Sequence, residues 1–345
     1  MIDIYKKGIY FISDSASFSY GAICLADGLN QLGVPIFANI STHDPAVSDF
    51  VFLPCADKAK LHQAFCAVID LQDTRPYYHQ AVRFEAPHER TIVLCMQDDA
   101  GSFCVDGVSA LLCAHENRFR KIAGQRIPIG FGLSSAMICK SADVLLQVPR
   151  ASNFLYNFRP SLNQHLRAAL DLSLLPVLEK HIPVRQQLTT PGRWNDDYFA
   201  LLCGSLGCLA YGGAFEQDLS GNDYLMQNER FRAFVSCVKQ QRKTVVLRWD
   251  SWRFWESLVF GCVTLHLDFE EYGFELPVMP ENWKHYVGIN LSDVKADVER
   301  LMDERSRWPE IAWQGRQWAI EHYSPLAVAR RFLGNHNKSC REVSP

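Results

Sequence analysis

Residues 154–188 read FLYNFRPSLNQHLRAALDLSLLPVLEKHIPVRQQL, and this stretch predicts a strand, a turn, a helix and a second strand. The apolar run FLYNF (154–158) is rich in residues that favour strands, and FRPS is a turn sequence. The next segment, residues 162–180, carries one apolar stripe at helical spacing, formed by Leu166, Leu170, Leu174 and Leu178. IPVRQQL (182–188) then returns to a strand pattern. Alternation of short strands with longer helices is typical of parallel α/β units.

The same alternation occurs earlier in the chain. GIYFIS (8–13) predicts a strand, residues 20–32 a helix closed by Gly33, and VPIFANI (34–40) the next strand. Further strand-like runs follow, namely DFVFLP, CAVIDL, TIVLCM and SALLCA, with SSAMICKS as a helix. These runs predict one Rossmann-like sheet in the first part of the chain.

The second part continues the pattern beyond residue 188. The expected elements are a helix at 196–203, the strand LGCLAY ending at Gly212-Gly213, the strand VVLRW, the helix WRFWESLVFG, the strands VTLHL and YVGIN, and helices at 292–304, 308–321 and 325–334. About 30 polar residues, 214–243, are expected to be an insertion. We therefore predict an α/β protein with two Rossmann-like domains, 1–148 and 149–345, facing a central cleft. The closing helices could cross back to the first domain.

Composition narrows the classes of function. The 345 residues have 48% hydrophobic and 21% charged side chains, which is the range of folded globular proteins. Lys plus Arg total 35 against 38 for Asp plus Glu, so the chain has no net positive field for a polyanion. Nucleic acid is therefore not an expected partner.

The cysteines and the apolar segments indicate the cellular compartment in which the protein is expected. The 12 cysteines are scattered singly, largely in apolar runs and without CxxC spacing, so we expect buried thiols and a reducing compartment. The apolar run after Lys6 and Lys7 is too short for a signal peptide, and residues 198–215, although uncharged, contain too many Gly and Ser for a membrane helix. We expect a cytoplasmic protein without an integral membrane segment.

One helix start carries the clearest chemical pattern. Arg253 and Glu256 are three residues apart, so they share a helix face. If the preceding strand ends at the cleft, the Arg can bind a diphosphate at the helix N-terminus and the Glu can accept hydrogen bonds from a ribose diol. The alternative from spacing alone is a surface Arg-Glu pair.

This stretch, SWRFWESLVFGCVTL, resembles the donor-site motif S-x-R-x-x-E-x-x-x-x-G-C-x-P-V of exostosin-like and related GT-B glycosyltransferases, and the second half of the chain is similar to a glycosyltransferase family 1-like C-terminal domain. Matching positions are Ser251, Arg253, Glu256, Gly261, Cys262 and Val263, followed by Leu276, Pro277 and Trp283 in the next loop. A segment upstream is also similar, through Tyr198, Ser205, Cys208, Leu209 and Gly212. The resemblance implies that Arg253 and Glu256 hold the diphosphate and ribose of a nucleotide sugar.

Other donor-site candidates surround this motif. Arg159 lies in the first turn of the second domain, where it could meet the diphosphate or pair locally. Gly212 and Gly213 would let the backbone approach a nucleotide, although a plain turn explains them equally well. Arg248, just before the motif, completes the set.

A general base for the acceptor hydroxyl is expected from the first domain, at the ends of strands. The candidates are His115 and Glu116, which rank first, then Asp14, Asp98 and Asp99. Each of these also suits an ordinary cap or turn.

No P-loop, nucleophile elbow, dinucleotide fingerprint or zinc-protease motif is present, and the lack of a D-x-D doublet disfavours a metal-dependent enzyme. We therefore predict a metal-independent glycosyltransferase without a cofactor, whose partners are a nucleotide sugar and a glycan or small-molecule acceptor. The alternative is a two-domain protein that binds a sugar or nucleotide without chemistry. A nucleotide-dependent epimerase or dehydrogenase is disfavoured by the missing Gly-rich fingerprint.

Overall fold

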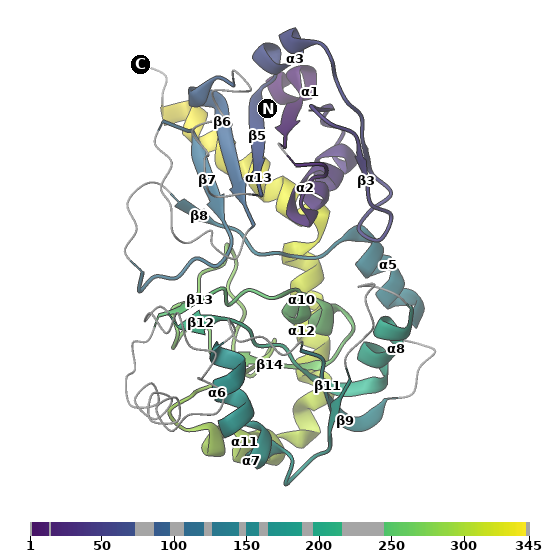
Figure 1. Ribbon diagram of the computed structural model, residues 1–345, viewed down its shortest axis with the longest axis vertical. Helices are drawn as coiled ribbons and strands as arrows, with labels where there is room; N and C mark the ends of the chain where they lie inside the picture. The colour runs from purple at the N-terminus through teal and green to yellow at the C-terminus, as the bar shows by residue number, and fades with distance from the viewer. Residues whose placement is uncertain are drawn as a thin grey trace. The chain divides into compact units, whose positions relative to one another are not determined.

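Parallel strands organise both parts of the chain in the computed structural model (Figure 1). The structure describes residues 2–13, 15–72, 86–96, 107–120, 126–144, 150–158, 165–187, 196–215 and 245–342. The chain divides into two compact units. The first comprises Met1–Ala114, Ile122–Cys139 and Ile320–Pro345, and the second comprises His115–Lys121 and Lys140–Ala319.

The first unit contains a six-stranded, wholly parallel sheet in the order β2-β1-β5-β6-β7-β8. Its strands are β1 (Ile9–Ile12), β2 (Ile36–Ala38), β5 (Cys66–Leu71), β6 (Thr91–Cys95), β7 (Ala110–Cys113) and β8 (Arg126–Pro128). The central strands β1, β5, β6 and β7 are buried along their whole length, which explains their almost continuous apolar sequences. The chain leaves β1 toward β2 on one side and later enters β5 on the other, so the switch in strand order lies between β1 and β5.

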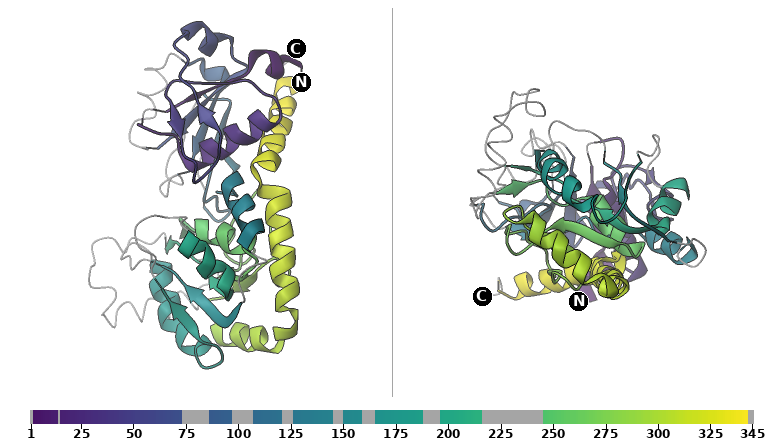
Figure 2. Two further views of the ribbon diagram at one scale, coloured as in Figure 1. Left: turned by 90° about the vertical axis from the view of Figure 1, so that its right-hand side faces the viewer. Right: turned by 90° about the horizontal axis from the view of Figure 1, so that it is seen from below.

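Helices accompany this sheet. They are α1 (Ile2–Lys7), α2 (Tyr20–Gln31), α3 (Lys58–Gln63), the 3₁₀ helix η1 (His88–Arg90), α5 (Ser135–Val144), which continues into the second unit, and α13 (Pro325–Glu342). The last of these packs beside α2, as Figures 1 and 2 show. Gly28 makes this approach possible, because a Cβ there would lie 1.9 Å from the Pro325 carbonyl oxygen. The C-terminal helix thus belongs to the first unit. The sequence analysis allowed for such a crossing of the closing helices back to the first domain.

The second unit contains a five-stranded parallel sheet in the order β10-β9-β11-β14-β15. Its strands are β9 (Ala151–Tyr156), β10 (Val184–Gln186), β11 (Ser205–Leu209), β14 (Val263–Leu267) and β15 (Val287–Ile289). The order reverses between β9 and β11. Both sheets therefore have the doubly wound arrangement that the alternating sequence pattern predicts.

The helices of the second unit are α6 (His165–Ser173), α7 (Leu175–Leu178), α8 (Asp196–Gly204), α10 (Trp252–Val259), α11 (Val294–Asp303), the 3₁₀ helix η3 (Arg305–Arg307) and α12 (Trp308–Tyr323), which ends in the first unit. The predicted leucine stripe is confirmed, because Leu166, Leu170, Leu174 and Leu178 are all fully buried. The single helix predicted over 162–180 is interrupted, however. Pro176 lies at the start of α7, where its missing N–H and fixed φ begin a new helix.

Two predicted strands contribute little or nothing to the large sheets. DFVFLP forms β4 (Val51–Phe52), which pairs antiparallel with β3 (Thr42–His43), and it meets the first sheet only through a parallel bridge between Pro54 and Ala38. VVLRW forms only β13 (Val246–Leu247), which pairs antiparallel with β12 (Ala214–Phe215). Each run is apolar enough for a strand, but its main partner is a short neighbouring strand rather than the parallel sheet.

The segment His115–Lys121 also differs from the predicted division at residue 148, because it packs within the second unit. The Asn117 amide donates to the carbonyl oxygens of Val246 and Tyr272 at 3.2 and 3.0 Å. The segment follows β7, a strand of the first sheet, but these hydrogen bonds attach it to the second unit. His115 and Glu116 therefore come from the second unit and not, as expected, from the first.

Candidate functional site

The carboxyl ends of β9 and β11 form the switch point of the second sheet, the position at which open parallel sheets bind ligands. Asn157 and Phe158 follow β9, and the segment Ala210 to Gly213 follows β11. Phe158 and Tyr211 lie together there, with ring centroids 4.9 Å apart.

The start of α10 meets this switch point. The Ser251 hydroxyl caps the helix by accepting a hydrogen bond from the Arg253 backbone N–H at 3.3 Å. The half-buried Arg253 side chain donates from Nε to the Asn157 carbonyl oxygen, and its guanidinium carbon lies 5.4 Å from the centre of the Phe158 ring. The structure thus brings a cation and a helix N-terminus, both favourable for an anion, to the carboxyl end of β9.

A second arginine, Arg167, which the sequence analysis missed, also lies against the Phe158 ring. The guanidinium carbon of Arg167, on α6, lies 4.6 Å from the Phe158 ring centre. Burial and the charge of Arg253 lower the pKa of Arg167 to about 10, so the group remains cationic at neutral pH. In the sequence Arg167 is one residue past the buried Leu166, and periodicity alone does not reveal where such a polar side chain points.

Glu256 is buried, with only 2% of its surface exposed, which rules out the alternative of a surface Arg-Glu pair. The Tyr198 hydroxyl, also buried, donates a hydrogen bond to Glu256 Oε2. Burial and the neighbouring carboxylate raise the pKa of Tyr198 well above its usual value, so the phenol keeps its proton. The predicted contact of Glu256 with a ribose stays a prediction.

Gly213 has a structural role of its own. Its φ of +128° is strained for other residues, and a Cβ there would lie 2.7 Å from the Leu247 carbonyl oxygen. Its own carbonyl accepts a hydrogen bond from the Leu166 N–H at 3.2 Å. Gly212 is buried beside it. The pair lies at the switch point, but the close approach that Gly213 permits is to Leu247; an approach to a nucleotide remains a prediction.

His115 is buried, and its Nδ1 accepts a hydrogen bond from the Asp250 backbone N–H at 3.0 Å. Burial and the charge of Arg248 lower the pKa of His115 to about 3, so the ring is neutral near pH 7. Because Nδ1 accepts, the proton of the neutral ring resides on Nε2. In this arrangement the ring is a hydrogen-bond donor and not a proton acceptor. The half-buried Glu116 follows it, and its carbonyl accepts from Trp249 Nε1 at 3.0 Å.

Four predicted site residues, Asp14, Asp98, Asp99 and Arg159, lie outside the described residues. The first sheet instead shows a buried carboxylate that the sequence analysis passed over, at the switch between β1 and β5. Asp70 accepts from the backbone N–H and the hydroxyl of Ser19, the N-cap of α2, both at 2.6 Å. The signal in the sequence was an Asp within the apolar run CAVIDL. Its contacts secure the start of α2.

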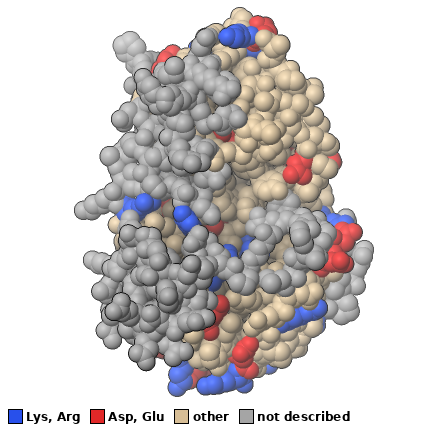
Figure 3. Space-filling model, viewed as in Figure 1, with Lys and Arg blue, Asp and Glu red and all other residues tan. Residues whose placement is uncertain are grey.

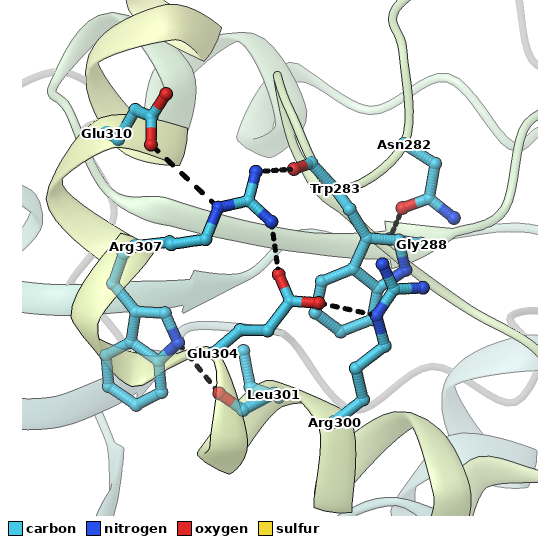
Figure 4. A network of polar contacts seen from close by, with 9 residues as sticks. Asn282, Trp283, Gly288, Arg300, Leu301, Glu304, Arg307 and Glu310 are labelled. Carbon is cyan, nitrogen blue, oxygen red and sulfur yellow. Dashed lines mark hydrogen bonds and ion pairs between the residues drawn. The ribbon is translucent and has the colours of Figure 1, made fainter.

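The loop after β14 is held by a polar network, shown in Figure 4. Trp283 has a φ of +61°, and the Arg300 guanidinium carbon lies 4.0 Å from its ring centre. The Glu304 carboxylate accepts from Arg300 Nε at 2.8 Å and from Arg307, which also donates to the Trp283 carbonyl at 3.3 Å. Trp283, matched by the resemblance, thus joins its loop to α11 and η3.

The described residues contain no group of three or more His, Cys, Asp or Glu side chains arranged to hold a metal ion. Within the same residues, no helix has the length and apolar character needed to cross a membrane.

Comparison with solved structures identifies the fold. The chain aligns with an α-glucosyltransferase in complex with UDP-glucose and DNA containing an abasic site, with a TM-score of 0.52, 9% identity and coverage of 94% of this chain and 98% of the other. The α-glucosyltransferase in complex with UDP gives a TM-score of 0.51 at 10% identity, with 94% and 98% coverage. Anabaena HepE in complex with UDP and glucose gives 0.49 at 11% identity, with 96% and 99% coverage.

The chain has the GT-B fold. The likeness to the α-glucosyltransferase extends over almost the whole of both chains and agrees with the two parallel α/β sheets. No protein-family model and no curated protein sequence matches the chain. In this GT-B chain, the switch point of the second sheet, with Arg253, Arg167 and Tyr211, is the candidate site.

Proposed function

We propose that this chain is a glycosyltransferase that moves a sugar from a nucleotide-sugar donor to a hydroxyl acceptor. The observation that supports this most directly is the position of Arg253. Its guanidinium lies at the start of α10, against Asn157 and Phe158 at the switch point of the second sheet. A donor diphosphate at this point would meet both a fixed cation and a helix N-terminus.

The proposed chemistry follows from that electrostatic arrangement. Transfer of the sugar leaves both shared bonding electrons on the diphosphate, whose negative charge increases. Preorganised donors aimed at developing charge lower the barrier, and a guanidinium can do this without a metal ion. We therefore propose a metal-independent transfer that needs no cofactor. The buried Glu256, held by Tyr198, is proposed to read the ribose.

The choice of first ligand comes from the structural neighbours. The α-glucosyltransferase was solved with UDP and with UDP-glucose, so UDP is the first nucleotide to test here. That neighbour also holds DNA, but this chain has a net charge of -3. On the face in Figure 3, basic and acidic side chains of the described residues are interspersed. A glycan or small molecule is the acceptor class we propose.

The exostosin-like subtype and the cytoplasmic location are parts of the same proposal. The first rests on the matched motif from Ser251 to Val263. The second is supported by the absence of a disulfide among the described cysteines, which include buried thiols such as Cys203, Cys208 and Cys262.

The test begins with UDP, GDP and ADP titrated against the wild-type protein, with thermal stabilisation as the signal. Arg253→Ala should weaken nucleotide binding about tenfold or more, because charge-assisted hydrogen bonds contribute roughly 1.5–3 kcal/mol. Arg185→Ala, which removes an exposed arginine on β10, is the matched control and should bind normally. Equal binding by wild type and Arg253→Ala would refute the assignment.

A second measurement distinguishes a glycosyltransferase from a protein that binds a sugar or nucleotide without catalysis. The transferase should release UDP from a UDP-sugar in the presence of acceptor, and slowly to water in its absence. Tight sugar or nucleotide binding without any release across a panel of donors and acceptors would favour the binding protein.

A further inference from the structure

The Phe158 ring is the centre of a cluster drawn from four segments of the second unit. Arg167 and Arg253 lie 4.6 and 5.4 Å from its centre, measured from their guanidinium carbons. The Tyr211 and Tyr156 rings have centroids 4.9 and 5.0 Å away. These residues come from α6, the start of α10, the end of β11 and the end of β9.

Two like charges meet in this cluster. Two guanidinium groups share one ring, and neither forms an ion pair with a carboxylate in the part of the chain that the structure describes. The nearby Asp171 carboxylate accepts from the Tyr156 hydroxyl at 2.8 Å and offsets one positive charge. Burial and the charge of Arg253 lower the pKa of Arg167, so the two guanidinium groups oppose each other, and an anion bound between them would relieve that repulsion.

The hydrogen bonds are also incomplete. Among the described residues, buried donor atoms without a hydrogen-bond partner include Asn157 Nδ2, Arg167 Nε and Tyr211 Oη. Tyr211 is fully buried and Asn157 is 2% exposed. A buried polar group left unsatisfied is destabilising, so three at one switch point call for an explanation. One buried acceptor, Asp171 Oδ1, lies in the same cluster.

We infer that Arg167 and Tyr211, with the Asn157 amide, complete an anion-binding site with Arg253, and that this site takes the diphosphate of the donor. The inference rests on the proposed function and adds to it the residues that the motif does not contain. Two guanidinium groups and neutral donors can bind a group with two adjoining phosphates more fully than they can bind a single carboxylate. Asp171 orients the Tyr156 side of the cluster and moderates the charge.

This assignment makes a distinctive prediction, because a structural arginine and a ligand-binding arginine respond differently. If Arg167 serves mainly to bind an anion, Arg167→Gln removes a like charge next to Arg253 and should leave the melting temperature of the ligand-free protein unchanged or raised. The same change should weaken binding of UDP and of inorganic pyrophosphate about tenfold. Uridine, which lacks phosphate, should show no effect of the substitution.

The experiment is calorimetric titration of the full chain with UDP, pyrophosphate and uridine, for wild type, Arg167→Gln, Tyr211→Phe and Arg253→Ala. Arg185→Gln is the control, because it removes an exposed positive charge from β10, the strand that pairs with β9. Tyr211→Phe should weaken phosphate binding several-fold. The loss in Arg167→Gln/Arg253→Ala should be smaller than the product of the single losses, since both arginines hold one anion.

The outcomes separate this inference from the proposed function. UDP binding that depends on Arg253 but not on Arg167 or Tyr211 would overturn the inference and leave the function standing. If pyrophosphate binding depends on Arg167 but no nucleoside diphosphate binds more tightly than pyrophosphate, the anion site is supported and the nucleotide-sugar proposal is refuted. A lower melting temperature of ligand-free Arg167→Gln, with unchanged affinities, would assign Arg167 to packing on Phe158.

Discussion

Tyr198 and Glu256 form a buried hydrogen-bonded pair, with the phenol donating to the carboxylate across 58 positions of sequence. The pair joins α8 to α10, the helix that carries Arg253. A buried carboxylate needs such donors, because removing one leaves a desolvated charge poorly satisfied.

Tyr198→Phe should therefore destabilise the second unit by about 1–3 kcal/mol, the usual cost of an unsatisfied buried polar group. Denaturant unfolding of wild type and variant measures the difference. Glu256→Gln is the comparison, since its amide oxygen can still accept from Tyr198, and it should lose less stability than Tyr198→Phe. Equal stability of Tyr198→Phe and wild type would show that the hydrogen bond contributes little.

Glu256→Ala should weaken binding of every nucleotide-sugar donor by a similar factor, because we expect this carboxylate to contact the ribose and not the sugar. Binding constants for several UDP-sugars, each compared with its 2′-deoxyribose analogue, test the assignment. Discrimination against the deoxy analogue should disappear in the variant. A loss confined to one sugar would place Glu256 near the transferred group.

Turnover should survive EDTA, since the donor phosphates are expected to meet arginines and a helix N-terminus. The release of nucleotide from the donor, measured before and after chelation, decides the point. Complete loss on chelation, reversed by manganese or magnesium, would show that a cation is required.

Stability should depend on pH through His115, whose pKa of about 3 in the folded chain lies below the ordinary histidine value of 6.5. Below pH 6.5 the unfolded chain takes up a proton that the folded chain does not, so stability falls as pH drops toward 3. Between pH 6.5 and 5 this one group should cost about 2 kcal/mol, at 1.36 kcal/mol per unit.

His115→Asn tests that dependence. Asn can accept from the Asp250 N–H and tolerates the φ of +62° at this position. Unfolding free energies at pH 7 and pH 5 should therefore differ less in the variant than in wild type. His266, whose pKa burial lowers to about 4, is present in both proteins and cancels in the comparison. Parallel curves would mean that His115 is accessible to protons in the folded chain.

The sequence predicted the parts of the fold that depend on local periodicity. The leucine stripe from Leu166 to Leu178 and the three closing helices are present, and both sheets are parallel. The failures concern long-range partners. The runs that became β4 and β13 are as apolar as sheet strands, and nothing local shows that they pair elsewhere. Pro176 interrupts a helix whose apolar spacing continues across it.

The candidate site shows the same division. The spacing of Ser251, Arg253 and Glu256 was visible, because all three lie within one helix start. Arg167 and Tyr211 reach the site through the strand order, which brings the ends of β9 and β11 together. The place of His115 beside Asp250 depends on a contact 135 positions apart. Such contacts are properties of the assembled sheet and have no local signature.

The acceptor base is the last prediction. If the enzyme inverts the sugar's configuration, a proton acceptor must lie within about 3 Å of the attacking hydroxyl. His115 ranks first with Glu116 on sequence grounds, but its Nδ1 accepts from the Asp250 N–H and its proton is on Nε2. We therefore expect His115→Asn to retain turnover within about tenfold of wild type, less than the loss of a general base causes.

The remaining candidates are tested by single amide substitutions, Glu116→Gln, Asp14→Asn, Asp98→Asn and Asp99→Asn. Replacement of the base should lower turnover by roughly a hundredfold to ten-thousandfold and leave UDP affinity nearly unchanged, since the base contacts the acceptor and not the nucleotide. Near-normal turnover in all four, with His115→Asn also active, would exclude every one of these side chains. The donor's own phosphate, held by Arg253, would then be the proton acceptor in a reaction that retains configuration.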